Sequence, residues 1–95
     1  MKISSGDRVR VPDGVLVREL DEEAVILNLD TETYHGLDGV GTRMWAVLTS
    51  SPTIAAALAV LEGEYDVDPE VLRRDVLNLV ATLAEHRLVD VEAAS

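Results

Sequence analysis

The spacing of the apolar residues changes near residue 38 of this chain, and that change constrains the fold more than any other feature. Before it, short runs rich in valine and leucine have the pattern of β-strands, and turn-forming residues separate them. The turns are Pro12-Asp13-Gly14 and Asp21-Glu22. Because connections this short join antiparallel neighbours, we expect a meander of three strands. The expected strands are Asp7–Val11, Val15–Leu20 and Ala24–Leu29.

After residue 38 the apolar residues recur every three or four positions, which is the period of an α-helix. The first helix begins near Asp38, whose carboxylate can accept a free backbone N–H of the first turn. The second follows Ser51-Pro52-Thr53, with either Ser51 or Thr53 as its N-cap, and ends near Gly63.

The third helix has the clearest start, with Asp68 as its cap and Pro69 at its first position. It should run to His86 or Arg87, before a short strand over Leu88–Val91. The order predicts an α+β fold, winged helix-turn-helix-like, in which a three-stranded antiparallel sheet is followed by three helices. We expect one domain over residues 1–95, with its core between about residues 9 and 91.

The third predicted strand has apolar residues on both faces. Val25, Leu27 and Leu29 share one face, and Ala24 and Ile26 share the other. A strand with one face in water should carry polar residues on that face. Something else in this chain, or a partner, should therefore cover the second face. On the helices, Met44, Trp45, Val47 and Leu58 are expected in the core.

Composition excludes several classes of function. The chain has 18 acidic and 8 basic residues, a net charge of −10, which disfavours nucleic acid and anionic membranes as partners. It has no cysteine, and its two histidines lie far apart in sequence, so we expect no metal and no cofactor. No nucleophile with a base stands out, so we expect no catalytic residues and no enzyme activity. No targeting or membrane-spanning segment is visible, so we expect a cytoplasmic protein.

Two segments resemble the PqqD-like family. Val25 to Leu37 is similar to the family's strand ending in Asn-Leu, its turn and the aromatic stretch that leads into a helix. That helix has a Gly-x-x-x-Trp motif, which here reads Gly41 to Trp45. The match resumes at Tyr65-Asp66-Val67 and continues along the third helix, so that it covers residues 9 to 91. One departure is Arg87, where members often have glycine.

The resemblance implies the fold and function of a RiPP precursor peptide recognition element. Such a module binds the leader segment of a ribosomally made precursor peptide. The leader adds a strand to the sheet at the third strand and lies in the cleft between that strand and the third helix. The implied partners are the leader peptide and a separate leader peptidase or other modifying enzyme. A free-standing copy of this size most resembles the recognition subunit of lasso peptide systems, although such copies also serve quinone cofactor synthesis and other peptide pathways.

We therefore predict a leader-binding set on two elements. The backbone of the third predicted strand would pair with the leader, while the side chains of Leu27 and Leu29 could belong to the core. Asp75 on the third helix could accept a hydrogen bond from the leader, or could pair locally with Arg73 or Arg74. The full predicted set is Val25, Ile26, Leu27, Asn28, Leu29, Asp30, Arg73, Arg74, Asp75, Val76, Leu77, Leu79, Val80 and Ala81.

Other functions remain open at this point. The free sheet edge could bind another folded protein, as an adaptor does, or could pair with the edge of a second copy. A winged-helix fold could also bind DNA, although this chain is acidic and its third helix offers only Arg73, Arg74, Asn78 and Arg87 to bases and phosphates. A small hydrolase or transferase would need a catalytic set that the sequence does not show.

Overall fold

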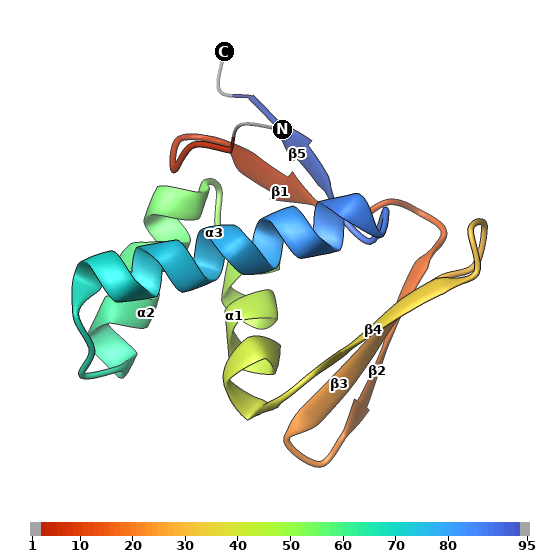
Figure 1. Cartoon of the computed structure of the whole chain (residues 1–95), viewed down its shortest axis with the longest axis horizontal. Coiled ribbons are helices and arrows are strands. Elements are labelled where there is room, and N and C mark those ends of the chain that lie inside the picture. The colour runs from red at the N-terminus through yellow and green to blue at the C-terminus, as the bar shows by residue number, and fades with distance from the viewer. Residues whose placement is uncertain (1–2, 94–95) are drawn as a thin grey trace.

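The computed structural model describes residues 3–93, and Figure 1 shows the arrangement of its strands and helices. Among these residues, no helix is both long and apolar enough to cross a membrane. The elements in chain order are β1 (Arg8–Arg10), β2 (Val15–Leu20), β3 (Glu23–Asn28), β4 (Thr33–Leu37), α1 (Gly39–Ser50), α2 (Ile54–Glu64), α3 (Pro69–Glu85) and β5 (Asp90–Glu92).

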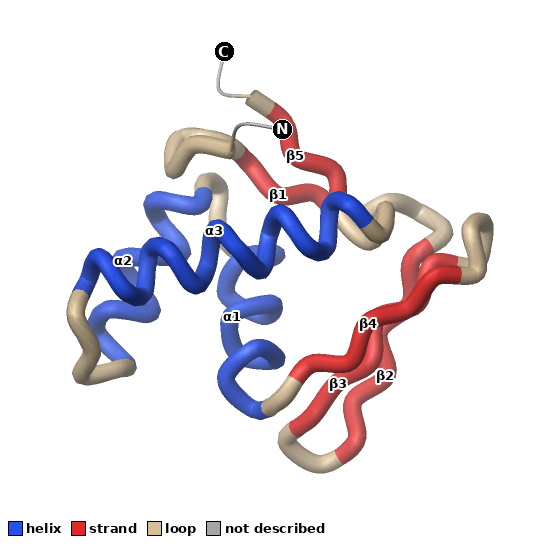
Figure 2. The backbone as a smooth tube through the Cα atoms, viewed as in Figure 1, coloured by secondary structure: helices blue, strands red, loops and turns tan. Residues whose placement is uncertain are grey.

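The strands form two separate antiparallel sheets. One has the order β2-β3-β4, and the other consists of β1 and β5. The fold class is thus confirmed, since a three-stranded antiparallel sheet precedes three helices. The helices gather on one side of this sheet (Figure 2).

The predicted membership of the sheet is wrong for its first strand. Arg8–Arg10 pairs with Asp90–Glu92 near the other end of the chain, with Val9 opposite Val91, and it does not pair with β2. Val9 is buried in the core cluster, so β1 lies against the helices. Pro12-Asp13-Gly14 therefore redirects the chain between two sheets, with Val15 N donating to Pro12 O over 3.1 Å.

The third strand of the sheet is β4, in a segment to which we assigned no strand from the sequence. Its residues pair with β3 in register, from Ala24 opposite Leu37 to Asn28 opposite Thr33. The inner face of β4 is partly or fully buried at Thr33, His35 and Leu37, while its other positions are exposed. The strand is short and contains glycine and histidine, so its sequence signal is weak.

All three predicted helix starts are confirmed by their caps. The Asp38 carboxylate accepts from Gly41 N over 2.7 Å, and the Asp68 carboxylate accepts from Glu70 N over 2.9 Å. Of the two alternatives for α2, Thr53 is the cap, because its hydroxyl accepts from Ala56 N over 3.1 Å. These contacts satisfy backbone N–H groups that have no partner inside a helix.

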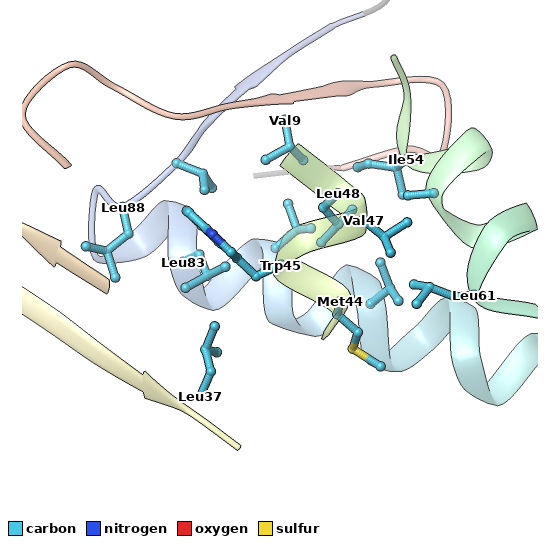
Figure 3. Close-up of a cluster of buried hydrophobic side chains, with 14 of the residues drawn as sticks. Val9, Leu37, Met44, Trp45, Val47, Leu48, Ile54, Leu61, Leu83 and Leu88 are labelled. Atoms are coloured by element: carbon cyan, nitrogen blue, oxygen red, sulfur yellow. The ribbon is translucent and has the colours of Figure 1, made fainter. Parts of the chain in front are cut away.

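The core lies between the helices and the inner face of the sheet (Figure 3). Met44, Trp45, Val47 and Leu58 belong to it, as predicted. From β3 the core takes Ile26, which is fully buried. Leu27 and Leu29 were the alternative core candidates, and that alternative is wrong, because Leu27 is half-buried and Leu29 is 54% exposed.

A buried joint connects the sheet to the end of α3. The Asn28 side chain is 6% exposed and donates from Nδ2 to Arg87 O over 2.6 Å. Its Oδ1 accepts from Asp30 N over 2.9 Å and from Thr31 N over 3.1 Å. Arg87 has φ 57°, the left-handed conformation that usually favours glycine after a helix.

Candidate functional site

The free edges of the three-stranded sheet are on β2 and β4, because β3 lies between them. Each residue from Ala24 to Asn28 lies opposite a residue of β2 on one side and a residue of β4 on the other. Their backbones have no place for a further strand, so the predicted pairing role of Val25 to Asn28 is wrong. The reason is that β1 was counted as the first strand of this sheet, which moved the expected edge by one strand.

Leu29 and Asp30, the last two residues of the predicted strand set, lie in the turn that follows β3. Leu29 N already donates to Gly14 O over 2.9 Å, and Asp30 N donates to the Asn28 side chain. The N–H groups of Leu29 and Asp30 are therefore used in hydrogen bonds within this chain that stabilise the turn. Of the six predicted strand residues, none lies on the free edge.

The edge that faces α3 is β4. The Thr33 hydroxyl at the start of β4 donates to His86 O over 2.7 Å. Two residues later, on the same face of the strand, the ring of His35 lies 5.8 Å from the ring of His86, measured between centroids. In Figure 1, β4 is the strand of this sheet that lies nearest to α3. A peptide added to β4 would thus lie beside the helix, whereas one added to β2 would lie at the opposite edge of the sheet.

These contacts also identify the flank of α3 that faces β4. Residues three or four positions apart share one side of a helix, so counting back from His86 gives Thr82, Leu79 and Asp75. We call these four residues the β4-facing flank. Leu79, Thr82 and His86 are half-buried, and Asp75 is exposed. Of the predicted helix residues, Asp75 and Leu79 are on the β4-facing flank.

The rest of the predicted helix set lies elsewhere. Val76 and Val80 are fully buried in the core and have no surface to offer a ligand. Arg73, Leu77 and Ala81 are four residues apart and form the opposite flank. A shallow hollow on this opposite side is lined by Glu70, Arg73, Arg74, Leu77 and Asn78.

Sequence reasoning missed the residues that place β4 against the helix, namely Thr33, His35, Thr82 and His86. Each is an ordinary turn or helix residue by type. One signal could have found part of this group: Thr33, His35 and Leu37 alternate, as the inner face of a strand does. With that strand in place, Ala24–Leu29 would have become the central strand.

Charge is sparse along the β4-facing flank. Asp75 is its one carboxylate, and it lies 3.8 Å from Arg74 in an ion pair whose side chains are 67% exposed on Arg74 and 52% exposed on Asp75. An exposed pair of this kind contributes little and leaves Asp75 accessible. Local pairing of Asp75 with Arg74, the alternative considered above, is therefore present and compatible with a ligand contact.

The strongest ion pair lies away from this site. Arg43 on α1 donates to Glu64 at the end of α2 through two bonds, of 2.7 and 2.6 Å. The hydrogen bonds and the opposite charge raise the pKa of Arg43 and lower the pKa of Glu64. Both groups are in solvent and connect two helices. Within the described ranges, no group of three or more acidic or histidine side chains could hold a metal ion.

What the arrangement offers is a strand edge with free main-chain donors and acceptors, next to a helix flank of leucine, threonine and histidine. This combination is suited to an extended peptide: the edge pairs with its backbone, and the flank contacts every second side chain. Short edge strands are one means by which proteins limit unwanted pairing with other chains. A helix flank beside the edge makes the edge selective, because a paired peptide must also fit the flank.

Three comparisons with known proteins bear on this site. The model of the family described as coenzyme PQQ synthesis protein D (PqqD) matches residues 23–89, from β3 to the end of the core. A solved structure described as TbiB1 in complex with the TbiA(beta) leader peptide is 33% identical, with a TM-score of 0.78. The match covers 85% of this chain and 94% of that one. None of the curated proteins matches the sequence.

Proposed function

The chain belongs to the PqqD family, and on that premise we propose that it binds the leader segment of a ribosomally made precursor peptide as an added strand along β4. The observation that supports this most directly is the free edge of β4, held beside a half-buried helix flank by Thr33 and His86. The fold is also that of TbiB1, which was solved with a leader peptide.

Strand addition along β4 sets the length and the pattern of the ligand. β4 has five residues, so a segment of similar length would pair with it and span about 17 Å. Side chains of the added strand alternate between the two faces of the sheet. Those on the side of His35 and Leu37 would meet the β4-facing flank, and their neighbours would lie beside Tyr34 and Gly36.

The composition of the flank favours apolar leader side chains at the inward positions. Leu79 is half-buried and contributes to the packing around the core, so a leader side chain placed against it would bury further apolar surface. Asp75 remains exposed at one end of the flank and would accept a hydrogen bond from a leader amide or hydroxyl. A net charge of −10 favours a neutral or basic leader.

We also propose that the protein delivers the bound leader to a separate enzyme, either a leader peptidase or another modifying enzyme. What supports this is membership of the PqqD family, together with the open edge of β4 beside α3. The chain would then capture the substrate, and the enzyme would carry the catalytic groups.

The side-chain part of the proposal can be tested with two leucines on the same helix. Leu79 lies on the β4-facing flank and Leu77 on the opposite one, and both are half-buried and packed against the core. The probe is a fluorescein-labelled synthetic peptide with the sequence of a candidate leader, taken from a short open reading frame sought near the gene for this chain, and its binding is followed by anisotropy. Leu79→Ala should weaken binding by roughly tenfold or more, as expected for a central apolar contact. Leu77→Ala should change it by less than about twofold.

The backbone part needs a different probe. In an antiparallel pair, alternate residues of the added strand exchange main-chain hydrogen bonds with the edge. Leader peptides N-methylated at one position each should therefore lose affinity at every second position within the paired segment. A loss that does not alternate would contradict strand addition. Equal losses for Leu77→Ala and Leu79→Ala would contradict the assignment of the flank.

A further inference from the structure

The free edge of β4 is uncharged along its length and has a carboxylate at each end. The strand reads Thr-Tyr-His-Gly-Leu from residue 33 to residue 37. Glu32 precedes it directly and Asp38 follows it directly, and both residues are exposed. We call Glu32 and Asp38 the flanking carboxylates. A peptide that pairs with the whole of β4 would therefore have a negative charge beside each end of its paired segment.

Backbone geometry places both flanking carboxylates next to the edge. Asp38 has an extended backbone, with φ −76° and ψ −176°, and its Oδ1 accepts from Gly41 N at the start of α1. Glu32 has φ 59°, a left-handed conformation in the turn that leads into β4. The other carboxylate of this turn, on Asp30, points elsewhere, because a Cβ added to Gly14 before β2 would lie 2.5 Å from its Oδ2. Asp30 thus lies towards β2.

Neither flanking carboxylate is in an ion pair within the described part of the chain. The ion pairs found among residues 3–93 are Arg10–Glu92, Arg43–Glu64 and Arg74–Asp75. The backbone of Arg87 lies near the start of β4, but its exposed side chain is in none of these pairs. The positive end of the α1 dipole offsets part of the charge on Asp38. The remaining negative charge at both ends of β4 can act on a ligand.

Two copies of this edge would repel each other. In an antiparallel pair centred on His35, Glu32 of one copy lies opposite Asp38 of the other, at both ends of the pair. In a parallel pair in register, each carboxylate lies close to its own copy. Like charges directly opposite each other destabilise a strand pair, and opposite charges stabilise it. This edge therefore favours a strand with a cation beyond each end of an uncharged segment.

We propose that Glu32 and Asp38 select leaders in which two basic residues, roughly six positions apart, flank an uncharged segment. This rests on the proposed function, in which the leader adds to β4, and it specifies the charge pattern that the edge accepts. Each cation lies opposite one flanking carboxylate, and an acidic residue at either place is repelled. The same two charges oppose pairing with a second copy while the edge is unoccupied.

Both charges can be removed without removing the helix cap. Asparagine caps helices as well as aspartate does, so Asp38→Asn keeps the bond to Gly41 N, and Glu32→Gln keeps the length of the side chain. The matched control combines Glu62→Gln with Asp66→Asn, which changes the net charge equally. Both control residues are exposed, on α2 and in the loop after it, away from the sheet (Figure 1). Circular dichroism and urea unfolding check that both double variants are folded.

The probe is the fluorescein-labelled candidate leader, in versions that carry lysine or glutamate at one position at a time, and binding is measured by anisotropy at low salt. Two positions should prefer lysine to glutamate by about threefold or more, one beyond each end of the segment that N-methylation identifies as paired. The preference should fall below about twofold at high salt and in the double variant of Glu32 and Asp38. It should persist in the control variant.

The outcomes separate this inference from the proposed function. A leader that does not bind the wild-type chain overturns the proposed function, and this inference with it. A leader that binds without a lysine preference at these two positions overturns the charge selection alone. So does a preference that survives removal of both flanking carboxylates, or one that the control variant loses equally.

Light scattering on the chain without leader tests the effect on a second copy. The wild-type chain should be a monomer. A dimer that the leader peptide dissociates would show that two β4 edges pair despite their charges, which also overturns the inference.

Discussion

Replacing Asn28 with alanine should cost the fold much more than the loss of one polar side chain usually does. Asn28 connects the end of β3 with Arg87, 59 residues further along the chain. Its carboxamide makes three hydrogen bonds, one to Arg87 O and two from the backbone of the turn after β3. With 6% of its surface exposed, water cannot replace all of them.

The magnitude follows from these bonds. Each contributes about 1 kcal/mol net, and the Arg87 carbonyl that loses its donor lies at a partly buried position. The N–H groups of Asp30 and Thr31 lie in an exposed turn, where water compensates in part. We expect Asn28→Ala to lower the free energy of unfolding by about 2–3 kcal/mol. For a domain of this size that lowers Tm by roughly 10–20 °C.

The assay is urea unfolding followed by far-UV circular dichroism and by the fluorescence of Trp45, which is 6% exposed. The control is Asn78→Ala, at the chain's other asparagine, on the exposed side of α3. Because alanine is the better helix former, this variant should be neutral or slightly more stable. If Asn28→Ala costs less than about 0.5 kcal/mol, the joint does not hold the sheet to the helix and the reasoning is wrong.

Three further predictions concern other contacts. Arg87→Gly should stabilise the fold by about 0.5–1 kcal/mol, because the strain relieved at the left-handed backbone exceeds the cost of the added entropy of glycine in the unfolded chain. Arg87→Ala should give no gain in the same urea titration. Equal effects of the two variants would contradict the backbone explanation. Arg43→Gln should raise the pKa of Glu64 in an NMR titration, since the Arg43 guanidinium lowers it. Glu64 therefore favours the folded state above its unfolded pKa, and this contribution is lost as pH falls through the lowered value; an unchanged pKa would refute the coupling. Leu61→Ala, at a fully buried position on α2, should cost about 2–5 kcal/mol in urea unfolding, and a cost under about 1 kcal/mol would show that the core relaxes there.

The parts of the fold that could be predicted are those that depend on neighbours in the sequence. Asp38 and Asp68 cap helices because each carboxylate reaches an N–H two or three residues later. Strand partners do not depend on near neighbours. β1 and β2 are close in sequence and similar in composition, yet β1 pairs with β5 at the far end of the chain. The hydrophobic pattern of β1 is satisfied by either partner, so the pattern could not decide.

The candidate site could likewise be predicted only in part, because some of its features depend on contacts between distant residues. The family resemblance indicated a strand and the third helix, and both elements are present. Which strand and which flank depend on contacts between distant residues. Leu77 and Leu79 are equally apolar, and only the approach of His86 to His35 distinguishes their two flanks. No spacing within α3 contains that information.

The hydrogen bonds at the end of α3 should affect both the stability of the fold and the affinity for a peptide. Asn28 and Thr33 each hold a backbone oxygen of the helix end, at Arg87 and His86, over 2.6 and 2.7 Å. These two bonds fix the start of β4 relative to the β4-facing flank before any peptide is present. A peptide that adds to β4 then meets an edge and a flank already in place, so less ordering opposes its binding. Arg87, whose φ is 57°, supplies the carbonyl oxygen that accepts the bond from Asn28. An Asn28 variant that weakens this joint should therefore reduce leader affinity as well as stability, although Asn28 lies on the central strand β3 and not on the β4 edge.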